Sequence, residues 1–249
     1  MIVEASLVHE FVPTGRLRAS LNMANVLLAQ SRTSAERPAG VTVDLSRELA
    51  SRLGVEVTFL QSEAPGDALT AVVEGQADVA FLAVEPKRAQ DVYFTAPYVQ
   101  IDGCYLACDE SPLHDQAEVD RPGNEVIVIG TSAYDLYLTR TLKHATIVRM
   151  PDAEQVLQAF IQRRSGRSVV AGIKQALLAD AARMKGVRLL QGNFMAIMQA
   201  MVLPRTSSEP ARAWVKAFVE EMTDSGFVAA SLERHAIQGA TVVRSDAQT

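Results

Sequence analysis

Apolar and polar residues follow two periods along the chain, and their alternation predicts a first α/β unit. Residues 17–22 (LRASLN) and the alternating VEVTFLQ that follows Gly54 are expected to be strands, and the near-continuous apolar run 77–84 is typical of a buried parallel strand. Helical spacing lies between them, in DLSRELASRLG with Asp44 as the expected N-cap and Gly54 as the C-cap, and in residues 66–75. The predicted order is therefore βαβαβ.

A second run of the same kind begins near Glu125. VIVIG, ATIVRM and SVVAGI are predicted strands, and the segments between and after them, SAYDLYLTRTLKH, DAEQVLQAFIQRRSG and QALLADAARMKG, are predicted helices. The polar, Pro-containing passage IDGCYLACDESPLHDQAEVDRPGNE separates the two runs and suits a crossing between lobes. Near the C-terminus, Trp214, Phe218 and Met222 mark the core face of an amphipathic helix. The chain thus reads as two α/β units.

Ligands of open α/β sheets bind beyond the carboxyl ends of the strands, so the strand exits hold the candidate site. Two exits come from each half of the chain: Asn22 to Asn25 and Ala83 to Arg88 in the first, Gly130-Thr131-Ser132 and Gly172-Ile173-Lys174 in the second. Their side chains offer amides, hydroxyls and cations. Such groups favour a small polar or anionic ligand.

Each candidate has an ordinary structural alternative. Arg88 can grip a carboxylate with a bidentate fork, or it is a surface residue of a helix. Free N–H groups at the turn, with the hydroxyl of Thr131 or Ser132, can hold the same carboxylate, or Ser132 only caps its own helix. Lys174 is a second cation at a strand exit, or a solvated lysine. The local sequence leaves these alternatives open.

Composition narrows the possible partners and cofactors. The formal net charge is -5 and no dense basic run occurs, so nucleic acid and anionic membranes are poor candidates. Cys104 and Cys108 are expected to be packed thiols on a strand, too far apart for a disulfide, and with no His or Cys pair nearby we expect no metal site. The four histidines stand far apart and are predicted at the surface. No cofactor is expected.

Five segments in order resemble the extracellular solute-binding proteins of family 3, which have the type II periplasmic-binding fold. They are LRASLN, GVTVDLSRELASRLGVEVTF, EGQADVAFLAVEPKRAQDVYFTAPYV, VIVIGTSAYDLYL and SGFVAASLERHAI, and the resemblance runs from about Leu17 to Ile237. It implies two lobes of mostly parallel sheet flanked by helices, joined by a hinge of crossing strands. We expect lobe 1 to comprise residues 1–106 plus 198–249 and lobe 2 residues 107–197.

The resemblance also implies a function. Family members capture polar amino acids and related acids in a cleft between the lobes, which close around the ligand, for an ABC transporter. The turn EPKRA places Arg88 on the family's carboxylate-binding arginine, and GTS places Ser132, with Thr131 beside it, on the family's hydroxyl. We therefore expect a monomeric solute-binding protein whose partner is a transporter permease.

Other positions depart from the family pattern. A small hydroxyl or carbonyl side chain is usual five residues before the arginine, but Ala83 stands there, after Phe81 and Leu82; Lys174 replaces the aspartate that pairs with the ligand's ammonium. Asn22 and Asn25 replace the usual aromatic sandwich with amides. Because a lysine beside an ammonium is a like-charge pair, the sequence favours an organic acid, such as a dicarboxylate, between Arg88 and Lys174.

Two further functions remain as alternatives. Proteins resembling cyclohexadienyl dehydratases share this fold, but catalysis needs a general acid, and the nearest candidates, Glu85 in the turn and Asp180 along its helix, are poorly placed. A cytoplasmic ligand-sensing module would need a partner protein for its output. The N-terminus shows no export signal, so we expect either a mature periplasmic protein or a cytoplasmic one. We do not expect an enzyme.

Overall fold

The computed structural model describes residues 5–31, 38–163 and 166–244. The chain divides into two compact units: residues 1–100 with 198–249 form unit 1, and residues 101–197 form unit 2. The sequence placed the first crossing six residues later, after residue 106. The crossing falls inside one uninterrupted strand, β6 (Val92–Cys108), so no turn residue marks it in the sequence.

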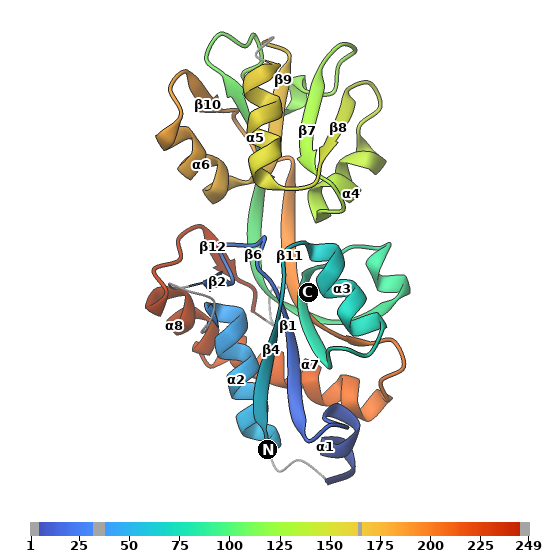
Figure 1. The fold of residues 1–249 in the computed structure, drawn as a ribbon. Coiled ribbons are helices and arrows are strands. Elements are labelled where there is room, and N and C mark those ends of the chain that lie inside the picture. The colour runs from blue at the N-terminus through green and yellow to red at the C-terminus, as the bar shows by residue number, and fades with distance from the viewer. Residues whose placement is uncertain (1–4, 32–37, 164–165, 245–249) are drawn as a thin grey trace. The chain divides into compact units, whose positions relative to one another are not determined.

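Unit 1 is a mainly parallel sheet covered by helices. Three parallel strands pair in the order β4-β1-β5, and β11 (Met195–Pro204) pairs with β5 in the antiparallel direction. Figure 1 shows α2 lying along β4, and α3 packs its Ala68 and Val72 against Ala80 and Leu82 of β5. Its elements are α1 (Ala5–Phe11), β1 (Arg16–Asn22), β2 (Gln30–Ser31), β3 (Pro38–Ala39), α2 (Val41–Leu53), β4 (Glu56–Ser62), α3 (Pro65–Val73), β5 (Val79–Ala83), a 3-10 helix η1 (Arg88–Gln90), α7 (Glu209–Asp224), α8 (Phe227–Arg234) and β12 (Ala240–Val242).

Unit 2 repeats the plan with the other strands of the same sheet, which has ten strands in the described part of the chain. β9 lies between β6 and β7, antiparallel to the first and parallel to the second, and β8 follows β7. The helix α5 (yellow in Figure 1) packs Phe160 against Ile127 and Val170. Its elements are η2 (Gln116–Glu118), β7 (Glu125–Ile129), α4 (Ala133–Thr141), β8 (Thr146–Met150), α5 (Ala153–Gln162), β9 (Ser168–Ile173), α6 (Lys174–Arg183) and β10 (Val187–Leu189).

Two strands carry residues of both units. β6 passes from unit 1 to unit 2 at Gln100, and β11 (Met195–Pro204) returns at Met198. The predicted order of strands and helices is confirmed, and Cys104 and Cys108 are buried free thiols, as expected. None of the helices in the described residues is long and apolar enough to span a membrane.

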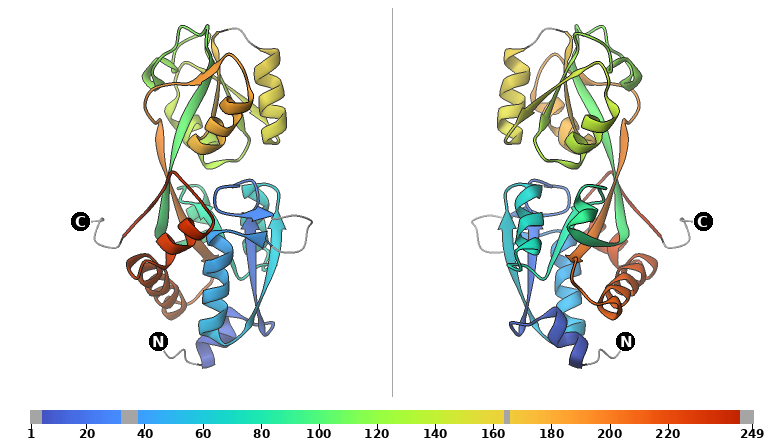
Figure 2. Two further views of the ribbon diagram at one scale, coloured as in Figure 1. Left: turned by 90° about the vertical axis from the view of Figure 1, so that its left-hand side faces the viewer. Right: turned by 90° about the vertical axis from the view of Figure 1, so that its right-hand side faces the viewer.

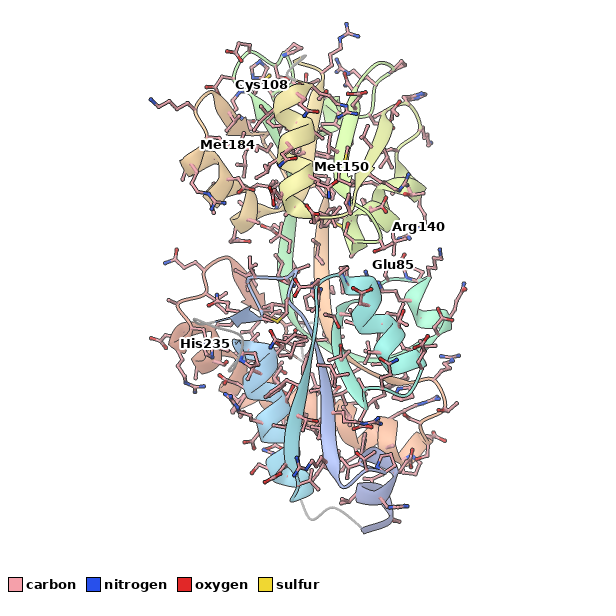
Figure 3. The ribbon with its side chains drawn as sticks, viewed as in Figure 1. Glu85, Cys108, Arg140, Met150, Met184 and His235 are labelled. Atoms are coloured by element: carbon pink, nitrogen blue, oxygen red, sulfur yellow. The ribbon has the colours of Figure 1, made fainter. Side chains whose placement is uncertain are left out.

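Two local predictions were wrong. Helix α2 begins at Val41 after Gly40, three residues before the expected cap Asp44, which lies in the first turn. Asp44 instead holds α8, because its Oδ2 accepts hydrogen bonds from Ser231 at 2.7 Å and Arg234 at 2.6 Å and lies 2.9 Å from Nε2 of His235. His235 was expected at the surface, but only 9% of its side chain is exposed. Figures 1 and 2 show α8 (red) beside α2 (blue), and Figure 3 labels His235 there.

Candidate functional site

Arg88 of unit 1 is a buried residue and not a surface arginine. It opens the short helix η1 after β5, and only 4% of it is exposed. Its Nη1 donates a hydrogen bond to the carbonyl of Ala83 at 3.2 Å. Burial lowers the pKa of Arg88 to about 10, against the Coulombic attraction of Glu85. The loss of hydration therefore destabilises the charged guanidinium more than the attraction of Glu85 stabilises it.

Glu85 shapes the turn that presents Arg88. Its carboxylate accepts the backbone N–H groups of Lys87 at 2.7 Å and of Arg88 at 3.3 Å, and only 2% of the residue is exposed. These bonds fix the chain between β5 and η1, as a cap fixes a helix start. Figure 3 labels Glu85 at this turn, where its carboxylate accepts hydrogen bonds from the backbone.

The other first-unit candidates lie on β5 and β1, which are parallel neighbours, so their carboxyl ends meet at one edge of the sheet. Phe81 and Ala83 are buried in β5, and Phe81 meets Tyr98 edge to face with ring centroids 6.0 Å apart. The carbonyl of Ala83, not its side chain, is what contacts Arg88. The backbone carbonyl of Ala83 therefore contacts Arg88 at the position where the family usually has a polar side chain.

Asn22 and Asn25 form the turn at the end of β1. The N–H of Asn25 donates to the carbonyl of Asn22 at 3.2 Å, and the carbonyl of Asn25 accepts from Leu28 and Ala29. Among the described residues, the side-chain Oδ1 atoms of both asparagines are buried without a hydrogen-bond partner. A buried amide oxygen without a donor costs about 1–3 kcal/mol. Both oxygens would therefore gain from a ligand that donates hydrogen bonds.

In unit 2, Ser132 caps its own helix α4, which is the alternative to ligand binding that the sequence left open. Its Oγ accepts the N–H of Asp135 at 3.1 Å and donates to the carbonyl of Ile129 at 2.7 Å. Tyr134 lies beside it, and burial raises the pKa of this phenol to about 12, against the opposite effect of its hydrogen bond with Ser132. Capping does not by itself exclude ligand contact, because a hydroxyl oxygen has two lone pairs.

Thr131 adopts a left-handed backbone with φ 61. This conformation is an outlier for a β-branched residue and stores about 1–3 kcal/mol of strain, of the kind that clusters at functional turns. Its N–H donates to Oδ2 of Asp135 at 2.9 Å, and Oδ1 of Asp135 accepts Nε of Arg149 at 2.9 Å. Asp135 was missed from the sequence, although the Ser-x-x-Asp spacing is a signal of helix capping.

Lys174 is the first residue of α6, directly after β9. Its Nζ lies 3.8 Å from Oδ2 of Asp102, and 39% of its side chain is exposed. Asp102 is a second residue that sequence reasoning missed. The proposed general acid Asp180, farther along α6, is held by Arg183 at 2.6 Å.

The structure thus brings the candidates together in two groups. In unit 1, Asn22, Asn25, Phe81, Ala83 and Arg88 gather at the carboxyl ends of β1 and β5. In unit 2, Thr131, Ser132 and Lys174 follow the carboxyl ends of the parallel strands β7 and β9. These are the sheet edges at which ligands of open α/β sheets bind.

Comparison with known families agrees with this arrangement. The sequence profile of the bacterial extracellular solute-binding proteins, family 3, matches residues 29–237, and the chain belongs to this family. Its fold is the type II periplasmic-binding fold expected from the sequence. Family members are extracellular or periplasmic binding proteins, and the solved structures below are of amino acid ABC transporter substrate-binding proteins and their relatives.

Solved structures share the fold at low sequence identity. An L-arginine-bound substrate-binding protein of an amino acid ABC transporter from Streptococcus pneumoniae is 17% identical, with a TM-score of 0.75 over 95% of this chain and 99% of that one. The P235GK mutant of ArgBP from T. maritima is 18% identical, with a TM-score of 0.73 over 92% of this chain and 98% of that one. An ancestral amino acid-binding protein, a precursor of cyclohexadienyl dehydratase, is 18% identical, with a TM-score of 0.73 over 91% and 98%.

One curated relative is an enzyme. Cyclohexadienyl dehydratase of Pseudomonas aeruginosa is 24% identical over 151 residues, which cover 59% of this chain and 56% of that protein. The chain thus matches little more than half of the enzyme's length. A match of this extent does not assign dehydratase activity to this chain.

Proposed function

We propose that this protein captures a small carboxylate-bearing solute for an ABC-type transporter, with Arg88 as the carboxylate anchor. The observation that carries the proposal is the buried guanidinium of Arg88, held at a strand exit by the carbonyl of Ala83. Since burial already lowers its pKa, an anion at this position would offset the desolvation of the charged form. A carboxylate matches the planar fork of arginine better than a halide does.

The amides of Asn22 and Asn25 support a solute with hydrogen-bond donors as well. Their buried Oδ1 atoms, without partners in the described part of the chain, accept hydrogen bonds and donate none. A carboxylate would be repelled by such oxygens, while an amine, amide or hydroxyl would satisfy them. We therefore propose that the solute presents its carboxylate to Arg88 and a donor group to the asparagines.

The preference for an organic acid rested on Lys174 as an unopposed cation. Because Asp102 lies 3.8 Å from Lys174, we propose the broader class, an amino acid or a related organic acid. The participation of Thr131, Ser132 and Lys174 in binding, together with Arg88, stays a prediction. So do the monomeric state, the transporter permease as partner, and a periplasmic or extracellular location.

Calorimetry with a panel of solutes tests the proposal. The panel contains amino acids, hydroxy acids, keto acids and dicarboxylates, with matched amides and esters that lack a free carboxylate. Binding of at least one free acid and no binding of its ester is the expected result. A tight complex with an uncharged solute such as a sugar, and none with any acid, would contradict it.

A dehydratase activity is the second candidate, because a relative of this chain is cyclohexadienyl dehydratase. The local geometry disfavours it: Glu85 accepts two backbone N–H bonds, and Asp180 is held by Arg183. Neither carboxyl is placed to protonate a leaving hydroxyl. Incubation with prephenate tests the activity directly, since formation of phenylpyruvate would establish an enzyme and its absence would leave a binding protein or a sensing module.

A further inference from the structure

The carboxylate of Asp102 lies beside Lys174 and opposes its positive charge. Oδ2 of Asp102 lies 3.8 Å from Nζ of Lys174, and both residues belong to one compact unit. The Asp102 and Lys174 side chains are 29% and 39% exposed, so neither charge is fully removed from solvent. At this distance each charge reduces the field of the other even at the high effective dielectric of a protein surface.

The register of the sheet explains why the two residues meet. β6 and β9 are antiparallel, with Gly103 opposite Ile173 and Cys104 opposite Gly172. β9 ends at Ile173 and Lys174 follows as the first residue of α6, so the chain carries Lys174 past the last paired position, next to Asp102.

The strand around Asp102 is tightly packed. Ile101 on one side is fully buried. On the other side, a Cβ added to Gly103 would lie 3.0 Å from side-chain atoms of Phe194 and Met195. Asp102 therefore stands on a backbone that has little freedom to move away from Lys174.

Both charges affect the pKa of the nearby thiol of Cys104. Burial raises the pKa of Cys104, while Lys174 lowers it and Asp102 raises it. At one neighbouring group the cation and the anion thus act in opposite directions. A solute bound beside Lys174 would meet the same opposed pair.

We infer that Asp102 determines which solute charge this protein accepts, because it offsets the charge of Lys174. The inference rests on the proposed function. An unopposed Lys174 would favour a second carboxylate on the solute, whereas the pair has no net charge and leaves a second anionic group unmatched. The solute group that meets this pair is then a neutral or cationic polar group and not a second carboxylate. Asp102 is a positioning residue that acts through Lys174.

Two matched pairs of solutes test the inference by calorimetry. Succinate and succinamate differ only in one carboxylate that is replaced by an amide, and glutamate and glutamine differ in the same way. The wild type is expected to bind succinamate or glutamine more tightly than the diacid. Asp102→Asn keeps the side-chain shape but removes its charge, and should shift the affinity ratio toward the diacid by about tenfold. Asp102→Glu should retain the wild-type ratio.

Two controls separate this role from a structural one. Asp109→Asn removes the same charge from an exposed residue of unit 2, about 23 Å farther along the chain direction of β6 at 3.3 Å per residue, and should leave the ratio unchanged. The double variant Asp102→Asn/Lys174→Met removes both charges and should return the ratio to within about threefold of wild type. Simple damage to the fold would weaken both solutes of a pair equally.

The outcomes distinguish this inference from the proposed function. A wild type that prefers the diacid, or an Asp102→Asn variant whose ratio is unchanged, overturns the inference, while loss of all binding in Arg88→Ala still supports the proposed function. A wild type that binds no carboxylate-bearing solute overturns both. A shifted ratio in Asp102→Asn that the double variant restores supports the inference.

Discussion

The N–H of Thr131 donates a hydrogen bond to the carboxylate of Asp135 across 2.9 Å, at the turn that begins α4. The protein's own anion therefore takes one of the backbone donors that a ligand carboxylate was expected to use. Ser132 completes the turn, because its Oγ accepts the N–H of Asp135. Any test of this turn as a binding site has to separate ligand contact from helix capping.

Ser132→Ala separates them when it is compared with a second cap. Loss of the hydroxyl should lower the free energy of unfolding by about 1 kcal/mol, because the N–H of Asp135 loses its acceptor. If Ser132 also holds the solute, affinity falls by about threefold or more. Urea denaturation and calorimetry measure the two effects.

The matched control is Asp152→Ala, which removes the N-cap of α5 in the same unit, where Asp152 accepts the N–H of Gln155 at 2.8 Å. It should lower the stability by a similar amount and leave the affinity unchanged. Equal affinity losses in Asp152→Ala and Ser132→Ala, or none in either, would remove Ser132 from the binding site.

Arg88→Ala should weaken binding of the carboxylate solute by more than about 2 kcal/mol, or roughly 30-fold, with little change in the fold. The reason is loss of a buried charge-assisted pair with the solute. Arg88→Lys should recover only part of the affinity, because an ammonium cannot form the bidentate pair. Calorimetry gives the affinities and circular dichroism reports on the fold.

Arg16→Ala is the control for charge. Arg16 lies at the other end of β1 in the same unit, where 61% of its side chain is exposed beside Glu56. It should bind the solute as the wild type does, because an exposed charge at that distance is screened by salt. Wild-type affinity in Arg88→Ala would place the carboxylate elsewhere.

Asn25→Leu is expected to weaken binding without destabilising the protein. The residue is 6% exposed and its Oδ1 lacks a partner in the described residues, so an apolar side chain removes an unsatisfied group. The free energy of unfolding should stay equal or rise, while affinity falls about tenfold.

Asn124→Leu provides the contrast in the same two measurements. Asn124 is also buried, but its Nδ2 donates to the carbonyls of Val119 at 3.0 Å and Glu118 at 3.3 Å. This variant should lose about 1–3 kcal/mol of stability, because both carbonyls lose their donor, and should retain solute affinity. A stability loss in Asn25→Leu as large as in Asn124→Leu would assign Asn25 a structural role.

Asp44→Asn should lower the free energy of unfolding by about 2 kcal/mol, because the carboxylate joins α2 to Ser231, Arg234 and His235 of the C-terminal segment. Solute affinity should not change. Asp67→Asn, an exposed acid in the first turn of α3, should alter stability by less than about 0.5 kcal/mol. Urea denaturation tests both, and equal stabilities would show that the Asp44 contacts are dispensable.

The sequence by itself determined the elements and the family. Period-2 and period-3.6 patterns depend on near neighbours, so β1, β5, β7 and β9 were predictable from apolar runs alone. The turn EPKRA likewise marked Arg88 as a candidate, because the strand exit and the arginine lie within one short segment.

Only the tertiary structure decided the surroundings of these residues. Asp102 meets Lys174 through the register of two strands that are about 70 residues apart in the chain, and Asp44 meets His235 across nearly the whole sequence. Burial of Arg88 likewise depends on how the strands and loops pack around it. Local patterns record which face a residue takes, but the partner of a charge is set by long-range pairing, which no local pattern contains.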